Sequence, residues 1–94
     1  MPMRRAHEGA RAMKILSNPA RFTIVTLLFK AKKHLCVNEI AEMAGLSQSA
    51  TSQHLSFLAA RGVVTGHRMG KTMCYVPTDS PITKALAKVI TIFA

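Results

Sequence analysis

Apolar residues recur at helical spacing along most of this chain and change to an alternating pattern after Gly62. The stretch from Met1 to Leu16 predicts a short helix with a basic start. A second helix is expected to begin at Pro19, because Ser17-Asn18-Pro19 supplies a cap residue followed by proline at the first helical position. Apolar side chains surround this second helix on nearly all sides, which predicts that it is the central core helix. They are Phe22, Ile24, Val25, Leu27, Leu28 and Phe29.

Two shorter helices are expected next. A brief extended segment from Leu35 to Val37 precedes a helix from Asn38 to Ala44, which Gly45 closes. Ser47 is a good cap for a fourth helix that reaches Arg61, with Gly62 as its stop.

β-branched residues then predict a hairpin. Its strands are Val63 to Thr65 and Thr72 to Val76, joined by a turn from Gly66 to Gly70. Pro77 ends the second strand, and Asp79 or Ser80 caps a last helix with Pro81 near its start. The predicted fold class is mainly α with a small β-hairpin, in the order α-α-α-α-β-β-α: a winged helix-turn-helix that fills residues 1–94 as one domain.

The length and charge of the chain narrow its class. Ninety-four residues suit one small domain, and 49% hydrophobic content argues against a disordered basic tail. Thirteen Lys and Arg face four Asp and Glu, and the resulting net charge of +9 favours a polyanionic partner. Apolar runs fall short of the roughly 18 residues of a membrane span, and Lys30, Lys32 and Lys33 stand where a secretory signal would need a cleavage site. Two cysteines are too few for a disulfide scaffold, so we expect a cytoplasmic protein without membrane contact.

The fourth helix has the chemistry of a DNA-reading helix. Its outward positions carry short hydroxyl or amide side chains, and no acidic residue would repel phosphate. A merely solvated helix face would carry the usual mixture of Glu and Lys. In the hairpin, Arg68 and Lys71, with His67, are expected beside the DNA backbone or in the minor groove; the alternative is a basic tip that only protects a sheet edge. The helix residues that we expect to contact DNA on this pattern are Ser47, Gln48, Ser49, Ser52, Gln53 and Ser56.

The last helix carries a wide apolar stripe of Ile82, Leu86, Val89 and Phe93. We expect it to pack against its copy, together with the first helix, in a homodimer. The alternative is that the stripe completes the core of one protomer. A twofold dimer presents two reading helices to half-sites about one helical turn apart.

Four motifs together resemble the ArsR/SmtB family of bacterial winged-helix repressors. They are Asn18-Pro19-x-Arg21, Leu35-Cys36-Val37-x-Glu39-Ile40, the run from Gly45 through His54-Leu55 to Leu58, and Gly70-Lys71-x-x-x-Tyr75. The resemblance covers nearly the whole chain. It implies a homodimer that binds operator DNA and is released by an inducer, commonly a metal ion or a reactive sulfur or oxygen species. It also implies that Ser49, Thr51, Ser52, Gln53 and His54 read DNA, although His54 is equally suited to a half-buried position.

The metal sites known in this family are incomplete here. One type of site uses a Cys-x-Cys pair in the third-helix motif, and here Asn38 stands at the position of the second cysteine. Another type uses an Asp and His residues on the last helix, and here no His, Glu or Cys follows Asp79. We therefore expect no metal cofactor. One weak alternative is a Zn²⁺ site built from His34, Cys36 and a residue of another segment; His7 is expected at the surface.

Cys36 is a candidate thiol sensor. It occupies the cap seat of a capping box with Glu39, and the helix N-terminus and Lys32, Lys33 and His34 favour a reactive thiolate. The resemblance includes dithiol repressors whose second cysteine lies on the terminal helix, which has none here. Cys74 is the alternative partner, if the segment around Cys36 pairs with the second hairpin strand. Because side chains alternate along a strand, Cys74 lies on the face opposite to that of Tyr75, which argues against that pairing. Two inert buried thiols are the alternative.

These observations predict a DNA-binding transcriptional regulator, a repressor released by a thiol-reactive inducer rather than by a metal, and no enzyme. A winged-helix module for protein interaction or RNA binding, without inducer response, is the alternative. A cysteine-dependent enzyme using Cys36 and His34 would lack a third orienting group.

Overall fold

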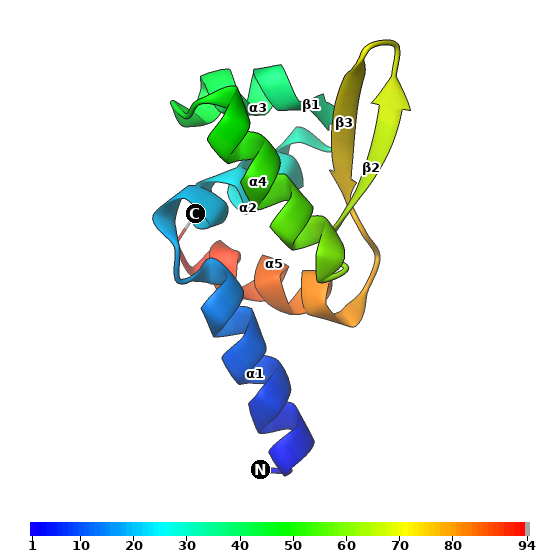
Figure 1. The fold of residues 1–94 in the computed structure, drawn as a ribbon. Coiled ribbons are helices and arrows are strands. Elements are labelled where there is room, and N and C mark those ends of the chain that lie inside the picture. The colour runs from blue at the N-terminus through cyan, green and yellow to red at the C-terminus, as the bar shows by residue number, and fades with distance from the viewer. Residues whose placement is uncertain (94) are drawn as a thin grey trace.

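The computed structural model describes residues 1–93, so Ala94 of the predicted 1–94 domain lies outside the described residues. Five helices and three strands follow one another along this part of the chain (Figure 1). Their bounds are α1 Met3–Leu16, α2 Pro19–Ala31, β1 Leu35–Cys36, α3 Val37–Ala44, α4 Gln48–Ala60, β2 Val64–Met69, β3 Thr72–Pro77 and α5 Pro81–Phe93. The strands form one antiparallel sheet in the order β1-β3-β2, so the predicted class is confirmed with one short strand added to the hairpin.

The helix boundaries follow the predicted caps. Asn18 Oδ1 accepts a hydrogen bond of 3.1 Å from the backbone N–H of Arg21 at the start of α2. Gly45 closes α3 with a φ of 69°, which glycine adopts without the cost of a Cβ. At the start of α5, Ser80 Oγ accepts from the backbone N–H of Thr83 at 3.3 Å, so Ser80 and not Asp79 is the cap.

The hairpin turn is shorter than the sequence predicted. Met69 pairs with Thr72, which leaves only Gly70 and Lys71 in the turn, and Gly70 has a φ of 68°. Gly66 lies within β2, directly opposite Tyr75. A Cβ on Gly66 would stand 2.8 Å from Tyr75 Cε2, so this glycine makes room for a ring and does not form the turn.

The core is built around α2, as predicted. Ile24, Val25 and Leu28 are completely buried and belong to one cluster with residues from every other helix. Leu86 of α5 is also completely buried in this cluster. Placing Leu86 in the dimer interface was therefore wrong, because it completes the core of its own protomer.

Arg21 joins three helices at one point. Its Nε–H donates to the carbonyl of Ile15 at 2.9 Å, near the end of α1. The same guanidinium lies 4.2 Å from the ring centroid of Phe57 on α4, and Arg61 lies over that ring at 3.5 Å. Arg21, the last residue of the Asn18-Pro19-x-Arg21 motif, thus fixes α4 relative to α1.

Helix α1 projects from the rest of the fold. Figure 1 shows it extending away from the other helices, with the N-terminus far from the sheet. Its first nine residues are exposed; the buried residues are Ala12, Ile15 and Leu16, at the end that meets α2 and α5. A helix of this length is marginal alone in water, so the projecting half lacks the packing that usually stabilises a helix.

Candidate nucleic-acid interface and cysteine pair

Helix α4 presents an uncharged polar face to solvent. Its residues from Gln48 to Ala60 include no Asp, Glu, Lys or Arg. Leu55 and Leu58 are completely buried on the opposite side and anchor the helix to the core. Five of the predicted contact residues are exposed together on the outer side: Gln48, Ser49, Ser52, Gln53 and Ser56.

Three other predicted contacts on this helix have different surroundings. Thr51 is completely buried and its hydroxyl donates to the carbonyl of Ser47 at 2.8 Å, so assigning it to DNA was wrong: its side chain stabilises the first turn. Ser47 is exposed, and its Oγ accepts from the backbone N–H of Ala50 at 3.0 Å as the predicted cap. His54 is half-buried.

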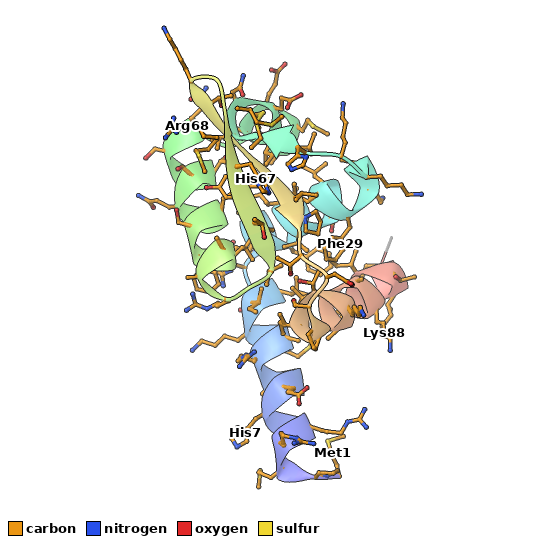
Figure 2. All side chains as sticks on the ribbon, turned by 90° about the vertical axis from the view of Figure 1, so that its right-hand side faces the viewer. Met1, His7, Phe29, His67, Arg68 and Lys88 are labelled. Carbon is orange, nitrogen blue, oxygen red and sulfur yellow. A yellow bond between two sulfur atoms is a disulfide. The ribbon has the colours of Figure 1, made fainter. Side chains whose placement is uncertain are left out.

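The hairpin supplies the positive charge that α4 lacks. Arg68 lies near the end of β2 and Lys71 in the turn, and both side chains are exposed. Figure 2 shows Arg68 at the hairpin end of the molecule, far from His7 on α1. The hairpin tip and the N-terminal end of α4 lie at the same end of the fold (Figure 1).

Cys36 and Cys74 form a disulfide. They are directly opposite one another in the β1–β3 register, with Cα atoms 3.7 Å apart, inside the limit of ~7 Å for bridging. The argument from strand alternation against this pairing was wrong. Leu35 and Tyr75 are a register pair that faces the core, so the next pair, Cys36 and Cys74, shares the other face.

The disulfide joins the start of the helix pair to the hairpin. Cys36 is the N-cap residue of α3, as predicted, and its backbone N–H donates to Glu39 Oε1 at 2.9 Å. Cys74 lies in the middle of β3, which pairs with both other strands. The disulfide therefore links the start of α3 covalently to the hairpin.

The predicted dimer stripe divides into buried and exposed parts. Leu86 is in the core, Ile82 and Val89 are half-buried, and Phe93 is 72% exposed. The Phe93 ring meets the Phe22 ring edge-on at 5.8 Å between centroids. Large apolar side chains are also exposed elsewhere on the two terminal helices: Met3, Met13 and Ile92.

Sequence reasoning missed two groups of residues. His34 and His67 are both exposed and meet as an edge-on ring pair with centroids 5.0 Å apart, although 33 positions separate them. Thr78, Ser80 and Thr83 form a hydroxyl cluster in which Thr83 Oγ1 donates to the carbonyl of Val63 at 3.1 Å. Helical and strand periodicity carries no signal for either contact, because strand register and a loop bring these residues together.

Within residues 1–93, no helix is long and apolar enough to cross a membrane. A pair of helices, α3 and α4, followed by a hairpin with basic residues defines a winged helix-turn-helix protein of the DNA-binding class. The sequence profile of the family described as "Bacterial regulatory protein, arsR family" matches residues 18–65, and the chain belongs to this family. It is a DNA-binding transcriptional repressor and not an enzyme.

Three similar proteins illustrate the relationship. The nodulation protein NolR of Rhizobium meliloti is 34% identical over 88 residues, which span 94% of this chain and 70% of NolR. The crystal structure of the transcriptional repressor BigR from Xylella fastidiosa superposes with a TM-score of 0.82 at 31% identity, covering 97% of this chain and 88% of BigR. The homodimeric winged helix-turn-helix DNA-binding domain of Mb0332 from Mycobacterium bovis gives a TM-score of 0.75 at 26% identity, covering 97% of this chain and 82% of that domain.

Proposed function

We propose that this repressor selects its operator with the exposed face of α4 and holds the DNA backbone with its hairpin. The observation that carries this proposal is the uncharged face of α4, whose N-terminal end lies at the same end of the fold as the basic hairpin tip, in a chain of net charge +9 (Figure 1). Gln53 and Gln48 suit bidentate hydrogen bonds to adenine in the major groove, and Ser49 and Ser52 suit bases or phosphates. Ser47 and the N-terminus of α4 suit a phosphate.

The charged residues have a separate task in this proposal. Arg68 and Lys71 contact phosphates or the minor groove, and each contact releases condensed counterions without reading sequence. Amide and hydroxyl side chains on α4 therefore determine the choice of sequence, and the basic residues determine affinity and orientation.

Replacing Lys71 with Ala is expected to weaken binding to every DNA sequence. Each lost phosphate contact reduces the magnitude of the negative slope of log K against log salt by about 0.9, and a dimer loses one such contact in each protomer. The measurement is binding to a fluorescent duplex across a salt series. Lys88→Ala is the matched control, because Lys88 is exposed on α5, away from the hairpin (Figure 2). An unchanged slope for Lys71→Ala would show that the hairpin does not touch the backbone.

We also propose that the chain is a homodimer formed through α1 and α5. Helix α1 and the end of α5 both carry large apolar side chains that are more than half exposed: Met3, Met13, Ile92 and Phe93. Packing these surfaces against a second copy buries them and stabilises α1. A twofold axis then presents two α4 helices to half-sites about one helical turn apart.

Phe93→Ala is expected to weaken the dimer at least tenfold, since a buried Phe side chain contributes about 1.5–3 kcal/mol. Sedimentation across a concentration series measures this shift. Met43→Ala removes a side chain of similar exposure from α3 and is expected to leave the dimer unchanged. A Phe93→Ala protein with wild-type dimerisation would place the interface elsewhere.

The cysteine pair is proposed to control operator binding. In a cytoplasmic setting the two thiols are reduced by default. Hydrogen peroxide oxidises one thiolate to a sulfenic acid, and attack by the second thiolate forms the disulfide, so that two thiols and one peroxide yield one disulfide and two waters. The disulfide then fixes the start of α3 to β3, and α4 and the hairpin lose the freedom to adjust separately to their grooves.

The test of operator selection uses the reduced protein and a DNA fragment from upstream of its own gene. At physiological salt, binding is expected to be roughly a thousandfold or more tighter than binding to a shuffled duplex of the same composition. Footprinting is expected to show two half-sites on one face of the DNA. Weak binding without sequence preference, or stronger binding to RNA or to a protein, would favour the alternative of an interaction module.

A further inference from the structure

The disulfide belongs to a row of residues that crosses the whole sheet. Cys36 of β1 is opposite Cys74 of β3, and Cys74 is opposite His67 of β2. Directly opposite residues in antiparallel strands point to the same face, with Cβ atoms about 4.5–5.5 Å apart. Two sulfurs and one imidazole therefore lie side by side on the face of the sheet opposite to the Leu35–Tyr75 pair.

His34 adds a second imidazole to this row. It precedes β1 by one residue and lies two positions before Cys36, which in extended backbone is the same face. Its ring is in contact with the ring of His67, with centroids 5.0 Å apart. The four side chains come from three segments that are far apart in sequence, and the sheet register gathers them.

The burial of the four residues is graded from the sheet to solvent. Cys74 is completely buried and Cys36 is half-buried, whereas both imidazoles are exposed. A cation would reach the sulfurs from the histidine side. In this structure Cys36 and Cys74 are joined in the disulfide, and no set of three or more His, Cys, Asp or Glu side chains within residues 1–93 is arranged to hold a metal ion.

We propose that reduction of the disulfide converts this row into a Cys₂His₂ site for Zn²⁺. A phosphine or dithiol reductant takes up the oxidising equivalents and leaves two thiols. Zn²⁺ then replaces the two thiol protons, which are released to solvent, and the two neutral imidazoles complete a tetrahedral set. Two thiolates and two imidazoles are ligands of a structural zinc site, in which ligand atoms lie roughly 3.3–3.8 Å apart.

The sequence alone suggested a Zn²⁺ site built from His34, Cys36 and a residue of another segment, and the proposed site supplies the ligands that were missing. The missing ligands come from the hairpin, as Cys74 and His67, and not from the third-helix or last-helix positions of the family's metal sites. Bound Zn²⁺ joins α3 to the hairpin through four ligands while it withholds both thiolates from oxidants. The inference rests on the proposed reduced state of the pair and does not require that oxidation releases DNA.

The experiment titrates the full chain, reduced with a phosphine and desalted without oxygen, with Co²⁺ as a spectroscopic substitute and with Zn²⁺ against a chromogenic chelator. The reduced protein is expected to bind one metal per chain and to show the visible absorption of tetrahedral, thiolate-ligated Co²⁺. The protein with its disulfide intact is expected to show neither.

Single variants separate this site from adventitious binding. His34→Ala and His67→Ala are each expected to weaken Zn²⁺ binding at least tenfold, while His7→Ala and His54→Ala leave it unchanged. Absence of one-to-one binding by the reduced chain, or binding indifferent to both His34→Ala and His67→Ala, would overturn the inference. Operator affinity measured in the same samples distinguishes the two proposals, because redox-dependent DNA release without metal binding would remove only the zinc site.

Discussion

Reduction of the Cys36–Cys74 disulfide is expected to lower the free energy of unfolding by about 4 kcal/mol. The bond closes a loop with a sequence separation of 38 residues, and chain-entropy models of the unfolded state assign that size of effect to such a loop. The loop contains α3, α4 and β2, so most of the helix-turn-helix loses this restraint. Urea denaturation of the oxidised and reduced proteins at one fixed chain concentration measures the difference.

Two variants make this stability test specific. Cys36→Ser and Cys74→Ser are each expected to have the stability of the reduced wild type and to be insensitive to reductant. Equal stability of oxidised and reduced wild-type protein would mean that the disulfide does not restrain the unfolded chain. Serine is itself a good N-cap, so a larger loss in Cys36→Ser than in the reduced wild type would mean that the Cys36 side chain stabilises the fold by something other than the disulfide and the cap of α3.

Replacing Gln53 with Ala is expected to weaken operator binding by about 1–3 kcal/mol, or roughly 5- to 150-fold, for each half-site contact that is lost. Gln53 is exposed on the face of α4 that we assign to the major groove, and its amide both donates and accepts. A bidentate contact to one adenine in each half-site is lost without any change in charge, so binding to a shuffled duplex is expected to stay the same.

The readout is the ratio of operator to shuffled-duplex affinity, measured for the wild type and for Gln53→Ala. Asn38→Ala is the control, because Asn38 carries an exposed amide outside α4. Substituting single base pairs across the operator is expected to show that the variant has lost preference at one position in each half-site. A uniform loss on all sequences would instead assign Gln53 to backbone contact.

Local signals in the sequence were sufficient to predict where the helices begin and end. Asn18, Ser47 and Gly45 cap or close helices where predicted, because a cap depends on the residue and the three positions beside it. The position of Cys36 as the N-cap of α3 was predicted in the same way. These elements place the exposed face of α4, so the outline of the candidate interface followed from sequence.

The remaining errors all concern contacts between distant residues. Gly66 was assigned to the turn because glycine is a turn signal, whereas the ring of Tyr75 from the next strand explains it. Leu86 was assigned to the dimer interface, because a helical stripe does not reveal which of its residues the core already covers, and Thr51 was assigned to DNA by the family resemblance, although it is completely buried. The disulfide depended on the β1–β3 register, which two residues of β1 leave undetermined in the sequence.

Operator release measured against the fraction of disulfide in the same sample tests the central claim most directly. Reduced protein is bound to a fluorescent operator fragment, treated with increasing hydrogen peroxide, and analysed by anisotropy and by mass spectrometry of the cysteine pair. We predict that bound operator falls in proportion to the Cys36–Cys74 disulfide and that Cys74→Ser stays bound throughout. Fully oxidised protein that holds its operator as tightly as reduced protein would contradict the claim that this pair controls DNA binding.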